Sequence, residues 1–255
     1  MSSPTWTPAA LSSEARAIDG RCWRLVEAQH RISTLKLVDD LDEQAVLEQL
    51  IETTKPSIPI ECRHLHYLLA TPFRYGSNYP AGSRFRRAGK TLGVYYASET
   101  VGTAVAEMAF YRLLFFSESP DTPWPSDAAE YTAFAAAISI SRAIDLGAPP
   151  LSSDRAIWTH PTDYAACQDL ADSVREAEIG AIRYISVRDP SGGVNFALMS
   201  CRSFAKPDPV DHQTWRIRIG PSGVQALCEF PEIRIGFDRT SFAADPRLKD
   251  MRWQR

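Results

Sequence analysis

The most distinctive part of the chain is a run of three segments, Gly82-Ser83-Arg84-Phe85-Arg86-Arg87-Ala88-Gly89, then Gly93-Val94-Tyr95-Tyr96-Ala97, then Thr103-Ala104-Val105-Ala106-Glu107. The pattern predicts a basic turn, a short apolar strand and a helix. Arg84, Tyr96 and Glu107 lie twelve and eleven residues apart, so consecutive elements can bring them to one pocket. A guanidinium for phosphate, a ring for stacking and a carboxylate for sugar chemistry favour a nucleotide-sugar site.

The helix expected from Thr100 to Phe116 gives Glu107 an unusual setting. It contains no proline, and the polar residues 98–100 before it can cap its start. Apolar side chains surround Glu107 on most sides, so no broad polar face explains a carboxylate there. Such a carboxylate must be paired, protonated or placed at a cleft. The alternative is a structural glutamate that binds neighbouring backbone or Arg112.

The segment from about 72 to 116 resembles the RES-domain family, the toxin halves of bacterial toxin–antitoxin pairs named for an arginine, a glutamate and a serine. The resemblance covers about residues 20 to 200, discontinuously. The motifs that carry it are Ser83-Arg84-Phe85, Tyr96-Ala97-Ser98, Ala104-Val105-Ala106-Glu107, Cys22-Trp23-Arg24-Leu25, Asp163-Tyr164-Ala165-Ala166-Cys167-Gln168 and Ile182-Arg183-Tyr184-Ile185-Ser186-Val187-Arg188.

The serine of the family pattern falls on Ala165 in this chain. Ser186, on the strand Tyr-Ile-Ser-Val-Arg, is the first candidate to supply the hydroxyl and to orient the ribose, and Thr162 is the second. Gln168 is a further candidate, which could read an amide of the ligand or bind backbone, with surface exposure as its alternative. Cys167, at the start of the same helix, is expected to pack in the core rather than to act as a nucleophile.

The resemblance implies an enzyme that uses NAD as its substrate and needs no metal. Family members cleave NAD with phosphate, giving nicotinamide and ADP-ribose-1″-phosphate, or transfer ADP-ribose to a protein. Breaking the nicotinamide–ribose bond passes through an oxocarbenium-like state, which a carboxylate stabilises, so this role falls to Glu107. The same resemblance gives Tyr96 the stacking role.

Arg84 and one further arginine are expected to hold the pyrophosphate or the incoming phosphate. Arg24 matches the family's early arginine. An insertion over about residues 30–70 also makes Arg74, in Thr-Pro-Phe-Arg-Tyr-Gly, a rival for this position. The choice between the two arginines stays open at this stage.

The resemblance also implies a protein partner, an antitoxin with a helix-turn-helix domain whose C-terminus plugs the pocket, and it allows a homodimer. Two alternatives remain. One is a non-catalytic relative that binds only a nucleotide or a partner, because Ala165 replaces the serine. The other is an ordinary metabolic glycosyl- or ADP-ribosyltransferase without a toxin role.

Composition limits the class of protein. A formal charge of −3 and a pI near 6.0 over 255 residues argue against direct binding of nucleic acid. No apolar run is long enough to span a membrane, and residues 1–10 lack the features of a signal peptide. The five cysteines are odd in number and widely spread, which favours reduced thiols in the cytoplasm.

The expected architecture is a single α+β domain with a mixed sheet, which by resemblance is similar to the fold of ADP-ribosylating toxins. We expect a flexible lead-in at 1–18, the catalytic domain at 19–205 and C-terminal strands at 206–255 that pack on the same domain. Helices are expected at 41–54 and 164–178, and strands at 21–28, 134–140, 180–187, 194–201, 214–219 and 232–236.

The motif Cys62-Arg63-His64-Leu65-His66 would place Cys62, His64 and His66 on one face if it formed a strand. A second half of a zinc motif is missing nearby, and the apolar residues 67–69 continue as core. We therefore expect no metal site. Neither a dinucleotide-binding glycine motif nor a phosphate-binding P-loop is present.

Overall fold

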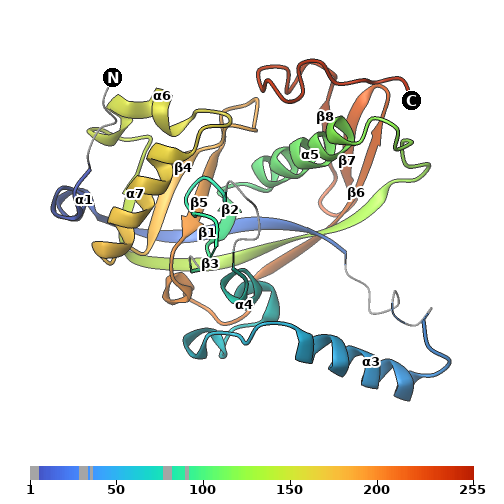
Figure 1. Cartoon of the computed structure of the whole chain (residues 1–255), viewed down its shortest axis with the longest axis horizontal. Coiled ribbons are helices and arrows are strands. Elements are labelled where there is room, and N and C mark those ends of the chain that lie inside the picture. Colours follow the sequence, from blue (N-terminus) through green and yellow to red (C-terminus); the bar gives the residue numbers. More distant parts are fainter. Residues whose placement is uncertain (1–5, 29–33, 35–36, 77–81, 90–91) are drawn as a thin grey trace.

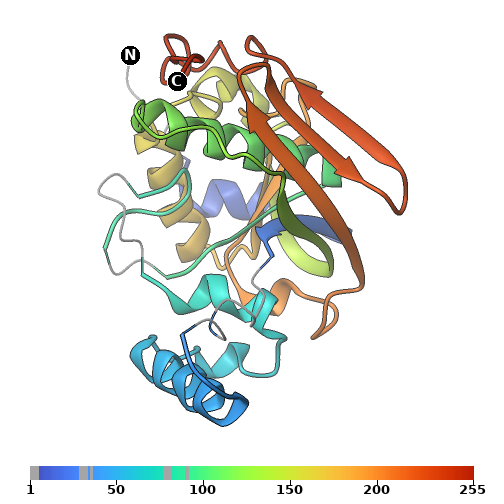
Figure 2. The ribbon, with the colours of Figure 1, turned by 90° about the vertical axis from the view of Figure 1, so that its right-hand side faces the viewer.

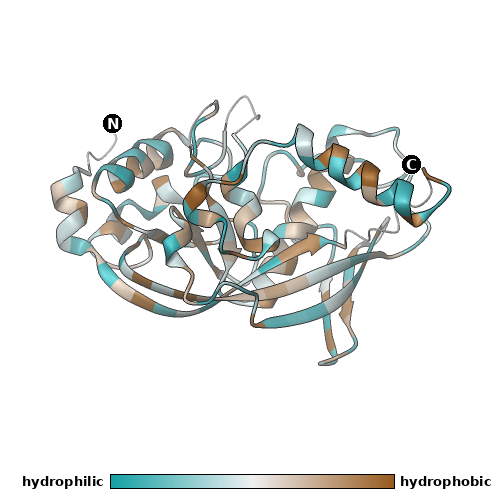
Figure 3. Ribbon diagram, turned by 90° about the horizontal axis from the view of Figure 1, so that it is seen from below, coloured by the Kyte–Doolittle hydropathy of each residue, from teal (hydrophilic) through white to brown (hydrophobic). Residues whose placement is uncertain are grey.

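Two long antiparallel strands, β1 (Arg16–Glu27) and β3 (Ala129–Asp145), run along the whole length of the sheet in the computed structural model (Figure 1). The structure describes residues 6–28, 34, 37–76, 82–89 and 92–255. The register of the pair runs from Glu27 opposite Tyr131 to Arg16 opposite Ala143. Residues 133–136 of β3 are all buried, so both faces of this strand lie in the core there. Hydrophobic and hydrophilic residues follow one another along the long strands of the sheet (Figure 3).

The sheet contains eight strands in the order β1-β2-β5-β4-β3-β6-β7-β8. The additional pairing of β1 with β3 closes the first five of these strands into a ring. The remaining strands are β2 (Tyr95–Ser98), β4 (Ala181–Ile185), β5 (Val194–Leu198), β6 (Asp211–Gly220), β7 (Gly223–Cys228) and β8 (Ile233–Phe237). β3 pairs in parallel with β4 and antiparallel with β6.

Helix α5 (Val101–Glu118) lies against β1 and β8, on the right of Figure 1. The side chain of Thr100 accepts a hydrogen bond from the Thr103 N–H at 3.2 Å and so caps the helix, as the polar residues before it predicted. Long apolar side chains of α5, including Phe110 and Leu113, are buried with Trp215 of β6. This packing fixes the helix that carries Glu107.

Helix α7 (Ala165–Glu176) covers the other half of the sheet together with α1 (Pro8–Glu14) and the short α6 (Arg155–Trp158). Leu11 of α1 is fully buried in this layer. The prediction of a flexible lead-in over 1–18 is therefore wrong for its described part. A threonine cap at Thr7 and a proline in the first turn favour the helix, and the burial of Leu11 holds it in place.

The insertion contains helix α3 (Leu41–Thr54), the short 3₁₀ helix η1 (Ile60–Cys62) and helix α4 (Tyr67–Arg74). Figure 2 shows α3 at the edge of the molecule, and none of its side chains is buried. The segment 62–66 forms a 3₁₀ turn and a bend rather than the strand assumed above, so its side chains do not alternate on one face.

The remaining helices and strands largely follow the sequence pattern, with differences of a few residues at their ends. Strand β7 was not predicted, although it pairs with both β6 and β8. In the C-terminal region, the buried side chains of Phe242, Leu248 and Met251 join the core of α5. Within the described residues, no helix is both long and apolar enough to cross a bilayer.

Candidate active site

Glu107 receives two hydrogen bonds on the same carboxylate oxygen. The hydroxyl of Ser186 donates to Oε1 at 2.7 Å, and the side-chain amide of Asn195 donates to Oε1 at 2.6 Å. Among the residues that the structure describes, none donates a hydrogen bond to Oε2. The carboxylate is thus held in one orientation, with one oxygen engaged by the protein.

Both donors are themselves fixed by neighbouring groups. Ser186 follows β4, and its Oγ accepts the backbone N–H groups of Arg188 at 3.1 Å and Asp189 at 3.0 Å. Asn195 lies on β5, and its Oδ1 accepts from the hydroxyl of Ser98 on β2 at 2.7 Å. The structure places the Ser186 hydroxyl against Glu107, and its role toward a ligand stays a prediction. Asn195 was not foreseen. A lone asparagine inside the apolar strand Val-Asn-Phe-Ala-Leu was the available signal.

Burial raises the pKa of Glu107 above its ordinary value, although the bonds from Ser186 and Asn195 and the charges of Arg188 and Arg84 act in the opposite direction. Arg112, the partner considered for a purely structural glutamate, instead pairs with Glu27 at 3.6 Å. Glu107 is therefore a carboxyl group that is largely shielded from water and is hydrogen-bonded on one oxygen.

Arg84 sits on a tight turn whose backbone groups pair reciprocally, Ser83 N–H to Arg86 O at 2.7 Å and Arg86 N–H to Ser83 O at 3.1 Å. Gly82 has φ +67°, and a Cβ at this position would lie 2.2 Å from Arg86 O, so the turn requires glycine. The side-chain amide of Gln168 donates to Ser83 O at 3.1 Å and Arg86 O at 3.4 Å. Gln168 thus holds the turn.

The hydroxyl of Tyr96 also holds this turn. It lies 2.9 Å from the Ser83 hydroxyl and accepts the Phe85 N–H at 3.1 Å. Burial raises the pKa of Tyr96, so the phenol is neutral at physiological pH. The structure therefore joins Tyr96, Gln168 and Arg84 in one arrangement.

The guanidinium of Arg84 is only 8 % exposed, yet its bonds go to backbone carbonyls, Trp158 O at 2.7 Å and His160 O at 2.9 Å. It also lies 4.7 Å from the centre of the Tyr164 ring. In the described part of the chain, no carboxylate forms an ion pair with Arg84. Its charge is felt by Glu107 without direct contact.

Arg188 approaches the same region from the end of β4, and it was not named as a site residue from the sequence. It is 4 % exposed, forms an ion pair with Asp245, and donates to Pro161 O at 2.5 Å and to the Tyr164 hydroxyl at 3.2 Å. Its guanidinium also lies 4.2 Å from the centre of the Phe110 ring. Arg84 and Arg188 thus both bind the segment 158–164, and the charges of both act on Glu107.

The other two arginines considered for phosphate differ in their relation to these residues: Arg24 contacts Tyr96, and Arg74 binds the insertion. Arg24 donates to Tyr96 O at 2.9 Å and lies 5.3 Å from the centre of the Tyr95 ring, and burial lowers its pKa. Arg74 ends α4, where it pairs with Glu52 at 2.6 Å and with Pro56 O. Arg74 is bound to the insertion itself, and its described hydrogen bonds go to Pro56 and Glu52 rather than to Glu107 or its partners.

The remaining sequence candidates are placed around α7. Ala165 is the first residue of this helix, and the N–H of Thr162 contacts His160 Nδ1 at 3.4 Å. Cys167 is fully buried beside Arg84, as expected of a packing residue. The described residues contain no group of three or more metal-ligating side chains.

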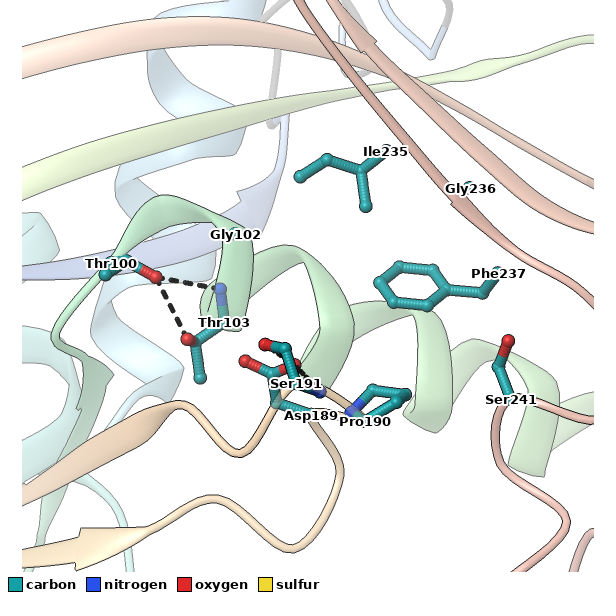
Figure 4. Close-up of a pocket in the computed structure, with 10 residues that line it drawn as sticks. All are labelled: Thr100, Gly102, Thr103, Asp189, Pro190, Ser191, Ile235, Gly236, Phe237 and Ser241. Atoms are coloured by element: carbon teal, nitrogen blue, oxygen red, sulfur yellow. Dashed lines mark hydrogen bonds between the residues drawn. The ribbon is translucent and has the colours of Figure 1, made fainter.

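A cavity of about 330 Å³ adjoins the start of α5 (Figure 4). Its lining comes from four places, which are the start of α5 with its cap Thr100 and Thr103, the turn after β4 with Asp189, β8 with Phe237, and Ser241 in the segment after β8. None of Glu107, Arg84, Tyr96 and Ser186 is among the lining residues of this cavity, so it is not the space around the Glu107 carboxylate.

The RES-domain family model matches residues 58–219, which include Arg84, Tyr96, Glu107 and Ser186. The chain therefore belongs to the RES-domain family. A similar solved structure is the crystal structure of the M. tuberculosis MbcT–MbcA toxin–antitoxin complex, with 12% identity over 75% of this chain and 80% of that chain and a TM-score of 0.42. No curated protein matches the chain. The resemblance noted from the sequence is confirmed, as is the mixed α+β architecture.

Proposed function

We propose that this protein cleaves the nicotinamide–ribose bond of NAD and uses inorganic phosphate as the acceptor. The observation that carries the proposal is the carboxylate of Glu107, held on one oxygen by Ser186 and Asn195 and flanked by two buried arginines. Membership in the RES-domain family supports the choice of NAD as substrate.

In the proposed reaction the bond between C1′ of the ribose and the nicotinamide nitrogen breaks, and its electron pair leaves with the nicotinamide. Positive charge then develops at C1′ and the ring oxygen. The ionised carboxylate of Glu107 stabilises this charge through Oε2, while Ser186 and Asn195 keep Oε1 in place. A phosphate oxygen then forms the new bond to C1′, which yields a phosphorylated ADP-ribose.

Arg84 supplies the cationic character that phosphate or pyrophosphate requires. Its described contacts are two backbone carbonyls, the Cys167 sulfur and the Tyr164 ring, none of them a carboxylate, so an anionic ligand gains from its field. The hydroxyl of Tyr96 is hydrogen-bonded to the turn that carries Arg84. The face of its ring is proposed to contact the nicotinamide or the ribose. Arg24 remains a proposed second anion contact, whereas the position of Arg74 gives it no part in this proposal.

The proposal includes a protein partner, an antitoxin with a helix-turn-helix domain, because family membership supports it. The partner would block the site by excluding NAD. Co-expression with the neighbouring reading frame followed by co-purification tests this part independently of the chemistry.

The direct test is NAD consumption by the purified protein with and without inorganic phosphate, with separation of the products. We expect phosphate-dependent loss of NAD and the appearance of nicotinamide and a phosphorylated ADP-ribose. Loss of NAD without phosphate would contradict phosphate as the acceptor. Free ADP-ribose as the product would then identify water as the acceptor, and ADP-ribosylated protein would identify a protein side chain. An inert protein that still binds NAD would contradict an enzymatic function.

The matched variants are Glu107→Gln and Glu118→Gln. Both replace a carboxylate by an amide on α5, but Glu118 is exposed at the end of the helix. We expect Glu107→Gln to reduce turnover by at least about 100-fold with NAD binding largely kept, as for loss of a group that acts in the transition state. Glu118→Gln should match the parent protein.

A further inference from the structure

The segment after β8, residues 238–251, lies beyond the part of the chain that the family model matches. It passes over α5 in both views of the fold (Figures 1 and 2). Phe242, Leu248 and Met251 are buried in the core that also contains Phe110 of α5. This packing brings one charged side chain, Asp245, to 5 % exposure.

Asp245 binds two arginines at once. One carboxylate oxygen accepts the backbone N–H and the Nε of Arg247, both at 3.0 Å, and the other accepts Nη2 of Arg247 at 3.0 Å and forms the ion pair with Arg188. Burial opposes ionisation of Asp245, but the bonds from Arg247 and the charges of Arg188 and Arg247 hold its pKa below the ordinary value. Asp245 is therefore a carboxylate under physiological conditions.

Arg188 links this carboxylate to the site. Besides Asp245 it binds Pro161 O at 2.5 Å and the Tyr164 hydroxyl at 3.2 Å. The same segment, residues 158–164, provides the two carbonyls that bind Arg84 and the ring over which Arg84 lies. A continuous series of contacts thus runs from Asp245 through Arg188 to the surroundings of Arg84.

We infer that Asp245 is a positioning residue of the active site, acting through Arg188. By pairing with Arg188 it anchors the guanidinium over Phe110 and so fixes the shape of segment 158–164. Without this partner, the buried guanidinium of Arg188 would lose the ion pair that holds it in place. The inference rests on the proposed function for its catalytic consequence, and on the contacts alone for its structural one.

The structural consequence is tested by amide hydrogen exchange in the full-length protein. Asp245→Asn should speed exchange in residues 158–164, whereas Glu232→Gln should not. Glu232 is the matched control because it lies in the same C-terminal region, is paired with an arginine, and is 67% exposed. Asp245→Glu should restore part of the protection. Unchanged exchange in 158–164 for Asp245→Asn would overturn the positioning role.

The catalytic consequence is tested by a double-mutant cycle on NAD turnover. Asp245→Asn should lower kcat/KM by on the order of 10-fold in the parent protein but by less than about 2-fold when Arg188 is already Gln, because residues that act through one another are not additive. Equal losses in both backgrounds would mean a general structural effect and overturn the inference. If Asp245→Asn does not fold, Asp245→Glu takes its place in the cycle with a smaller expected loss.

The two measurements separate the two ideas. Faster exchange in 158–164 without any NAD turnover by the parent protein would contradict the proposed function and leave the positioning role standing. Active parent protein with unchanged exchange and unchanged kcat/KM in Asp245→Asn would contradict the positioning role and leave the function standing.

Discussion

Ser186 and Glu107 lie 79 residues apart in the sequence, and the hydroxyl of the first donates to the carboxylate of the second at 2.7 Å. The serine itself is fixed by two backbone N–H groups, so its hydroxyl hydrogen points to Glu107 rather than to solvent. Ser186 thus sets both the orientation of the carboxylate and the balance between its charged and neutral forms.

Removing the Ser186 hydroxyl should therefore change the pH dependence of the enzyme. The hydrogen bond from Ser186 lowers the pKa of Glu107, so its loss raises that pKa further. Because the ionised carboxylate is the active form, the acid limb of the kcat/KM profile should move to higher pH in Ser186→Ala, with a loss of on the order of 10-fold at neutral pH. Ser153→Ala, at an exposed position of the 3₁₀ helix Leu151–Asp154, is the control. An unshifted acid limb would contradict this account.

Replacing Glu107 by Gln should make the protein more stable at neutral pH while it removes activity. The raised pKa of Glu107 means that the folded protein holds this proton more tightly than the unfolded chain does, so the contribution to stability is present below the ordinary pKa of 4.5 and is lost as pH rises through the folded value. The amide oxygen of Gln can still accept from Ser186 and Asn195. Thermal unfolding of both proteins should show a higher Tm for Glu107→Gln at pH 7, and the difference should shrink as pH falls through the raised pKa of Glu107 and change no further below about pH 4.5. A lower Tm for the variant at pH 7 would contradict the prediction.

Tyr96→Phe separates the two roles of this tyrosine. The phenyl ring can still stack, but the bonds to Ser83 and Phe85 are lost and the turn that carries Arg84 is loosened. We expect a loss of about 1 kcal/mol in stability and a fall of on the order of 10-fold in kcat/KM. Denaturant unfolding and steady-state kinetics measure the two effects. Full activity in Tyr96→Phe would assign the function to the ring alone.

Gly193→Ala should disturb the site from the loop that follows β4. A Cβ at this position would lie 2.1 Å from the Thr103 hydroxyl and 2.3 Å from Asp189 Oδ2, so the loop or the start of α5 must shift. Since Ser186 N–H donates to Gly193 O at 2.7 Å, the shift reaches Ser186 directly. We expect a destabilisation of about 1–3 kcal/mol together with reduced turnover. Gly192→Ala is the comparison, because no atom lies within 4 Å of its added Cβ, although its φ of +77° carries its own strain. Equal behaviour of the two variants would contradict a specific contact with α5.

The sequence predicted the parts of the site that follow from local pattern. The helix around Glu107, its cap at Thr100 and the strands around Ser186 come from periodicity and turn residues, and motifs gave Arg84 and Tyr96. Periodicity could not reveal Asn195, because one polar residue does not alter the pattern of an apolar strand.

Pairings between distant residues could not be predicted in this way. Arg188 and Asp245 are 57 residues apart, and no spacing rule relates a turn after β4 to a segment after β8. Helix α4 was also missed, because its Pro72 and mixed composition obscure the helical period. In each case tertiary packing decided the outcome, and a single sequence contains no direct record of it.

Strand β3 belongs to both halves of the sheet at once. One of its edges is occupied by β1 over nearly its full length, while the other bonds to β6 near its start and to β4 at its end. The helix of Glu107 packs on the half with β6, and Ser186 follows β4 in the other half. Neither half can melt while the other stays intact, so heating should abolish turnover and secondary structure in a single cooperative transition.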